Sequence, residues 1–176
     1  MNIDTVMVPD DPQLMSDALG FLLYTSRFLH PAEGPTFYSA RRGMRLRYPS
    51  GNNPFGELKA RRIVAQHQTE KTRAAREAMA AEKITPLHPS FAALKKQAYG
   101  DIADGKLQAR SLLIWGAQDP QVPVGLGRAL QQQLKADGVD SKLVIIGGAG
   151  HAPFVEFPAS FVRLLRAGCE TPPSEE

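Results

Sequence analysis

Two short apolar runs with a helical segment between them constrain the fold of this chain more than any other feature. Residues 111–115 and 143–146 are apolar without alternation, which is typical of strands buried on both faces of a parallel sheet. Between them, residues 124–136 repeat leucine every four positions, and Gly138 stands where such a helix should end. The order strand, helix, strand predicts a parallel βαβ unit and an α/β fold class.

One more helix is predicted after the second strand, followed by a tail. Pro158 suits the first turn of this helix, an apolar face follows it, and Gly168 is placed to end it. Residues 170–176 are polar and proline-rich. We therefore expect them to form a disordered tail.

The residues before Gly105 follow a different, mostly helical pattern. Helices are predicted over about 12–28, 36–44, 55–82 and 90–99. Residues 48–54 have turn composition and should form a loop, and the β-branched residues 3–8 could form a short strand. The helices have few strong apolar stripes, so we expect them to rest on another layer.

Composition narrows the class of protein. Cys169 is the only cysteine among the 176 residues, which excludes an intrachain disulfide and fits a reducing compartment. The chain starts without a charged segment leading into an apolar run, and its apolar stretches are too short to span a bilayer. These observations predict a cytoplasmic protein with no membrane partner.

The net charge of +3 is unevenly distributed. Residues 41–83 contain eleven Lys and Arg against four acids, a local charge of +7. Such a segment can bind an anionic substrate, an acidic partner or nucleic acid, or can simply be a solvated helix face with i,i+4 pairs. Aromatic residues do not alternate with the basic ones as they would on a stacking platform, so we predict no nucleic-acid partner.

A carboxylate and an imidazole follow the two predicted strands. Asp119 comes shortly after residues 111–115, and His151 comes shortly after residues 143–146. Adjacent parallel strands bring the loops at their carboxyl ends together, so these side chains should meet although 32 positions separate them. A carboxylate bound to one imidazole nitrogen fixes the tautomer, and the other nitrogen can then accept a proton. Asp119 and His151 are the predicted catalytic residues.

Simpler roles remain open for these and nearby residues. Asp119 can cap a turn before Pro120, and His151 can be a loop histidine with a satisfied hydrogen bond. Glu156 is better interpreted as a helix-entry or backbone-binding residue than as a second acid, and Trp115 as a core residue. The other histidines lack metal-ligand spacing, so we predict neither a metal nor a cofactor; they are His30, His67 and His88.

Two motifs resemble a known family. Residues 112–123 (Leu-Leu-Ile-Trp-Gly-Ala-Gln-Asp-Pro-Gln-Val-Pro) resemble the acid-bearing segment of α/β-hydrolases, and residues 148–158 (Gly-Ala-Gly-His-Ala-Pro-Phe-Val-Glu-Phe-Pro) resemble their histidine loop. The resemblance covers about residues 107–168. It implies a partial α/β-hydrolase fold, with a helical cap-like region over 1–105 and a C-terminal core segment over 106–169.

The family's nucleophile has no counterpart here. Its members carry the nucleophile, commonly on a Gly-x-Ser-x-Gly elbow, before the acid and the base, and this sequence contains no such motif. Ser50 and Ser90 lie in predicted turns of the helical half, and an early His-Gly oxyanion loop is also absent. The resemblance implies that about the first hundred residues of a complete hydrolase are not in this chain.

These observations predict a hydrolase component that supplies an acid and a base. Once completed by an N-terminal segment, it would act on an ester, lactone, amide, epoxide or carbon–carbon bond of a small molecule. Two strands also leave an open sheet edge, so we expect an N-terminal hydrolase chain as partner, or self-association. The chain could be a truncated hydrolase, a split subunit or a relic. The alternative function is non-catalytic binding or assembly on a hydrolase-like scaffold.

Overall fold

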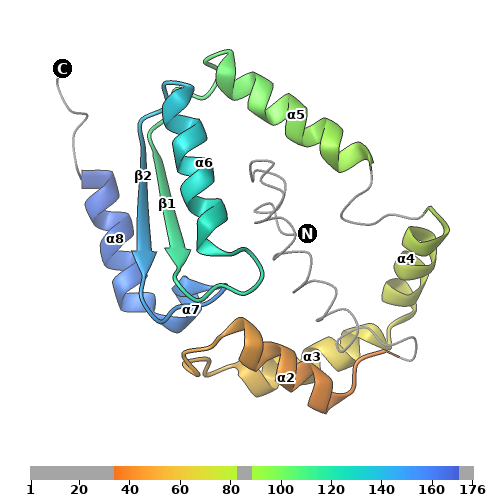
Figure 1. Ribbon diagram of the computed structural model, residues 1–176. Helices are drawn as coiled ribbons and strands as arrows, with labels where there is room; N and C mark the ends of the chain where they lie inside the picture. Colours follow the sequence, from red (N-terminus) through yellow and green to blue (C-terminus); the bar gives the residue numbers. More distant parts are fainter. Residues whose placement is uncertain (1–33, 83–88, 171–176) are drawn as a thin grey trace.

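The computed structural model describes residues 34–82 and 89–170 (Figure 1). Its elements are α2 (Phe37–Arg47), α3 (Gly56–His67), α4 (Glu70–Ala81), α5 (Pro89–Ala103), β1 (Ser111–Gly116), α6 (Val124–Ala136), β2 (Ser141–Ile146), α7 (Pro153–Glu156) and α8 (Pro158–Glu170). The predicted strand at 3–8, the helix at about 12–28 and residues 171–176 of the predicted tail lie outside the described residues. Glu170, predicted to begin the tail over 170–176, is instead the last residue of α8. Across the described ranges, no helix is long and apolar enough to cross a bilayer.

The predicted βαβ unit is confirmed. Strands β1 and β2 pair in parallel, with a register that runs from Ser111 opposite Ser141 to Gly116 opposite Ile146. Helix α6 connects them over the predicted residues and packs on both strands. Both strands therefore end at the same edge of the sheet, where the loops that carry Asp119 and His151 begin.

Helices α6 and α8 cover opposite faces of the sheet (Figure 1). Trp115 faces α6 so closely that a Cβ added at Gly127 would lie 2.8 Å from its ring. Leu112, on the other face of β1, lies against α8, where a Cβ added at Gly168 would be 2.7 Å from its Cδ2. Gly168 was predicted to end this helix, but α8 continues to Glu170. The close contact with Leu112 explains why a glycine occupies this helical position.

The strands are less buried than predicted. Residues 111–115 of β1 are only partly buried, and burial on both faces was therefore the wrong expectation for this strand. The reason is the width of the sheet, which in the described part of the chain has two strands. Within the described residues, each strand consequently has one side without a neighbouring strand to shield its side chains.

A small core joins α5 to the βαβ unit. Its buried members are Ile102 at the end of α5, Leu130 and Leu134 on α6, and Val139 before β2; partly buried Tyr99, Leu107 and Leu113 pack against them. Burying such side chains contributes about 1.5–3 kcal/mol each. The helical region is thus held to the sheet by apolar contacts at the chain's transition into β1.

The predicted long helix over 55–82 is instead two helices. Helix α3 ends at His67 and α4 begins at Glu70. The Thr69 hydroxyl accepts from the backbone N–H of Thr72 at 3.3 Å and donates to the carbonyl of Gln66 at 2.8 Å. Thr69 therefore satisfies backbone groups of both helix ends, which makes the break favourable without a proline or glycine. Helix α5 is longer than predicted and runs from Pro89 to Ala103.

A second cluster holds the α2–α3 pair against the histidine loop. Met44 and Tyr48 are buried against Ala152, and partly buried Ile63 and Val155 pack beside them. Helices α2 and α3 accordingly lie next to α7, at the end of the sheet where the strands finish (Figure 1). This places the predicted 48–54 loop beside the functional loops.

Candidate active site

The loop after β1 fixes the carboxyl group of Asp119. Its Oδ1 accepts hydrogen bonds from the backbone N–H groups of Gln121 at 2.8 Å and Val122 at 3.0 Å. Asp119 therefore has the turn-capping role that the sequence left open. Two backbone donors also hold the carboxyl group in one orientation, so capping and catalysis are compatible roles.

The loop after β2 presents the imidazole of His151. The backbone N–H of His151 donates to the carbonyl of Arg47 at 3.0 Å, which attaches this loop to the end of α2. Gly148 has a φ of 75°, a left-handed conformation that favours glycine. The chain can thus turn sharply after β2 and direct His151 toward the loop after β1.

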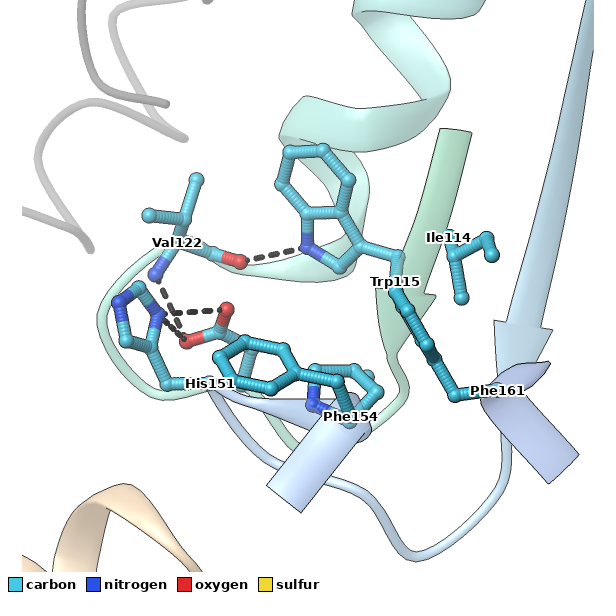
Figure 2. Close-up of a pocket in the computed structure, with 9 residues that line it drawn as sticks. Ile114, Trp115, Val122, His151, Phe154 and Phe161 are labelled. Atoms are coloured by element: carbon cyan, nitrogen blue, oxygen red, sulfur yellow. Dashed lines mark hydrogen bonds and ion pairs between the residues drawn. The ribbon is translucent and has the colours of Figure 1, made fainter. Parts of the chain in front are cut away.

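The two predicted residues meet. Nδ1 of His151 lies 3.0 Å from Oδ2 and 3.2 Å from Oδ1 of Asp119 (Figure 2). The side chains are only 10% and 7% exposed, so water competes little for this contact. A carboxylate at Nδ1 favours the neutral tautomer with its proton on that nitrogen, which makes Nε2 the acceptor.

Direct backbone contacts keep the two loops at this distance. The N–H of Gln118 donates to the carbonyl of Ala149 at 2.8 Å. At the end of β1, a Cβ added at Gly116 would lie 2.6 Å from the same carbonyl oxygen and still closer to that of Gly150. Only glycine fits at this contact, and the close approach brings the acid loop and the histidine loop together.

A pocket of about 180 Å³ opens beside the pair. Its walls are Ile114, Trp115, Gly116, Asp119, Val122, His151, Pro153, Phe154 and Phe161 (Figure 2). Phe154 and Phe161 pack edge to face with ring centroids 5.9 Å apart. Trp115, interpreted from the sequence as a core residue, also lines this pocket, and its Nε1 donates to the Val122 carbonyl at 2.8 Å. Apolar aromatic walls with a few polar groups are typical of small-molecule sites.

Glu156 is fully buried and binds backbone, as interpreted from the sequence. Its Oε1 accepts from the N–H of Gly150 at 2.6 Å, and its Oε2 accepts from the N–H and the hydroxyl of Ser50 at 3.2 and 2.5 Å. The amide of Asn52 also donates to the Glu156 carbonyl. Sequence reasoning missed Ser50 and Asn52 because more than a hundred positions separate them from Glu156.

Arg47 is another residue near the site that the sequence did not single out. Burial lowers the pKa of its guanidinium, whereas nearby Tyr48 and the carboxylate of Asp119 act to raise it. A positive charge therefore lies within electrostatic reach of the acid. The other arginines on α2 and α3 are all exposed: Arg41, Arg42, Arg45, Arg61 and Arg62.

The described residues contain no group of three or more His, Cys, Asp or Glu side chains that could hold a metal ion. Among them, His67 contacts Nη1 of Arg76 through Nδ1 at 2.8 Å. That contact joins His67 at the end of α3 to Arg76 on α4.

The fold defines the class of protein. The parallel βαβ unit and the helices packed on it form a partial α/β-hydrolase fold, and the chain is similar in sequence and in structure to proteins of the α/β-hydrolase superfamily. No protein-family model matches the sequence.

Three individual proteins are similar to this chain in sequence or in structure. The chain is 37% identical over 67 residues to the pimeloyl-[acyl-carrier protein] methyl ester esterase of Chromobacterium violaceum, a match that covers 38% of this chain and 25% of the esterase. It superposes on 2-hydroxy-6-oxo-6-phenylhexa-2,4-dienoate hydrolase of Rhodococcus sp. strain RHA1 with a TM-score of 0.57 and 16% identity, covering 94% of this chain and 52% of that one. An α/β-hydrolase from a deep-sea metagenome library gives a TM-score of 0.46 at 16% identity and covers 96% and 55% of the two chains. The chain thus spans about half the length of the solved hydrolases it matches.

Proposed function

We propose that Asp119 and His151 are the acid and the base of a nucleophile–His–Asp triad, and that this chain is a component of an α/β-hydrolase. The observation that carries the proposal is the 3.0 Å contact between Nδ1 and Oδ2 of two nearly buried side chains beside an apolar pocket. A structural ion pair alone would not require a pocket at the imidazole. The pairing of both features favours catalysis.

The geometry assigns a role to each group. Asp119, held by two backbone N–H groups, keeps the proton on Nδ1 and stabilises the imidazolium that forms during the reaction. Nε2 of His151 takes the proton of the nucleophile as this attacks the substrate carbonyl. It then returns that proton to the leaving group.

The nucleophile is supplied from outside this sequence, which has no Gly-x-Ser-x-Gly elbow. We propose that it comes from an N-terminal hydrolase segment, because the chain covers 52% of the solved hydrolase that it matches. In the described part of the chain the sheet has two strands, and the open side of each gives such a segment a strand with which to pair.

We propose a small ester as the substrate. The sequence match is to an esterase that acts on a methyl ester, and the pocket of about 180 Å³ has aromatic walls suited to an apolar acyl chain.

The proposal is tested with Asp119→Asn and the matched control Asp104→Asn, whose side chain is 69% exposed. In the purified chain, nitrogen NMR should show the neutral His151 ring protonated on Nδ1, and Asp119→Asn should abolish this preference. Hydrolysis of a p-nitrophenyl ester is then measured after mixing the chain with the separately expressed N-terminal half of the esterase. Asp119→Asn should reduce kcat of the reconstituted enzyme by about 10⁴-fold. Full activity of Asp119→Asn, or a tautomer unchanged by it, would contradict the proposed roles.

A non-catalytic role is the second candidate, and the half-buried side chains of β1 favour it. A binding or assembly protein would use the same open sheet to pair with another chain. The His151→Ala variant would then bind that chain as tightly as the wild type does. Neither protein would hydrolyse a substrate in the presence of that chain. Unchanged complex formation together with absent hydrolysis would therefore select this function over the first.

A further inference from the structure

Glu156 is buried in a way that calls for a role beyond helix entry. It is 0% exposed, and burying a carboxyl group is costly unless hydrogen bonds compensate. Among the described residues, three donors reach its two oxygens, and they belong to Ser50 and Gly150. Glu156 therefore joins two segments, the turn after α2 and the glycine immediately before His151.

The turn after α2 touches the histidine loop at several other points. The carbonyl of Arg47 accepts from the backbone N–H of His151 at 3.0 Å. A Cβ added at Gly150 would lie 2.5 Å from the same carbonyl oxygen and 3.0 Å from Cγ of Pro49. The loop that carries the imidazole is thus enclosed between this turn on one side and Gly116 at the end of β1 on the other.

We propose that Glu156 is the positioning residue for His151: it holds residues 47–52 of the helical region onto Gly150 and thereby keeps Nδ1 within bonding reach of Asp119. The inference rests on the proposed function, since it concerns the same acid–base pair. Glu156 does not touch the pocket and takes no proton in the reaction. Its effect passes through Gly150, because the N–H that it binds belongs to the residue adjoining His151.

The proposal makes the helical region part of the catalytic apparatus. Asp119 is held by its own loop, whereas His151 is held in part by a turn more than a hundred positions earlier in the chain. Displacement of that turn would leave the acid in place and release the base. A substrate or partner that moves α2 would consequently alter proton transfer without contacting either residue.

The test compares Glu156→Gln with two controls in the full-length chain. Glutamine has the same shape but replaces one acceptor oxygen with an NH₂ group, so it cannot accept from both Gly150 and Ser50. Glu77→Gln makes the same chemical change on the exposed face of α4, and Val139→Ala weakens the core away from the site. The main readout is the share of neutral His151 with its proton on Nδ1, measured by nitrogen NMR. Because a general loss of stability would not alter this ratio, the readout separates positioning from folding.

We expect Glu156→Gln to lower the Nδ1–H share several-fold relative to the Nε2–H share, and both controls to leave it unchanged. Ser50→Ala removes only the hydroxyl donor and should shift the ratio in the same direction by less, which provides a reading if Glu156→Gln does not fold. An unchanged tautomer in folded Glu156→Gln, or in Ser50→Ala if only that variant folds, would overturn the positioning role. If the wild-type chain itself shows no Nδ1–H preference, the proposed function fails instead.

Discussion

The contact between Gly116 and the histidine loop predicts a severe effect of one added methyl group. In Gly116→Ala, the new Cβ would lie 2.6 Å from the carbonyl oxygen of Ala149 and closer still to that of Gly150. Ordinary contact begins at 3.4 Å, so the first oxygen would have to retreat by about 0.8 Å and the second by more. Both obstructing atoms belong to the backbone and cannot rotate away as a flexible side chain would.

The magnitude follows from the absence of any easy relaxation. Overpacking in a rigid region costs about 1–3 kcal/mol, and occasionally more. Two backbone oxygens are involved here, and we therefore expect a loss of about 3 kcal/mol in the free energy of unfolding. For a chain of this length that corresponds to a fall of about 6–12 °C in Tm. The displaced loop should also move His151 from Asp119, so the Nδ1–H preference of the imidazole should decrease.

The assay is urea denaturation followed by circular dichroism, with Gly147→Ala as the matched control. Gly147 also follows a strand, but a Cβ added there meets nothing within 4 Å, so this variant should stay within about 0.5 kcal/mol of wild type. Nitrogen NMR of His151 accompanies the denaturation curves. A free energy of unfolding for Gly116→Ala within about 1 kcal/mol of that for Gly147→Ala would refute the predicted clash, because the loops would then separate at little cost.

Two further predictions concern the scaffold. Leu126→Ala removes a side chain of α6 that is 1% exposed and should destabilise the chain by about 2–5 kcal/mol in the same denaturation assay. The control Gln132→Ala, on the exposed side of the helix, should have almost no effect. Equal denaturation midpoints for the two variants would contradict the assignment of Leu126 to the core. Burial and, to a smaller extent, the charge of Arg76 lower the pKa of His67 from 6.5. Below about pH 6.5 the unfolded chain therefore binds more protons than the folded chain, and the free energy of unfolding should decrease as the pH falls. His67→Gln should therefore show a smaller drop in Tm than wild type between about pH 7.5 and 5.5, and an equal drop would disprove this contribution.

The contact between Asp119 and His151 could be predicted from the sequence because the rule that applies to it is topological. Once residues 111–115 and 143–146 are taken as neighbouring parallel strands, their following loops must meet, and Asp119 and His151 are the titratable residues just beyond them. The contact between Nδ1 and Oδ2 at 3.0 Å agrees with this reasoning. The helix between the strands was also predicted correctly, since leucine at every fourth position is a local signal.

The contacts that support the pair could not be predicted in the same way. In the sequence, Ser50 has the context of a turn residue and Glu156 that of a helix-entry residue, and nothing indicates that the two side chains meet. The break after His67 was missed because Thr69 interrupts the helix with its hydroxyl rather than through an obvious breaker. The partial exposure of β1 was missed because an apolar run indicates a strand that a full sheet would bury, but it does not indicate how many strands the sheet has.

The bond between Ser50 and Glu156 joins residues 106 positions apart, whereas the bond between Asp119 and His151 closes a loop of 32 positions. Closing the longer loop costs about 1 kcal/mol more chain entropy, by the logarithmic dependence on loop length. Bringing His151 to Asp119 therefore costs less chain entropy than bringing Ser50 to Glu156. Assembly of the site would finish with the docking of the α2 turn, and that last contact would also be among the first to open.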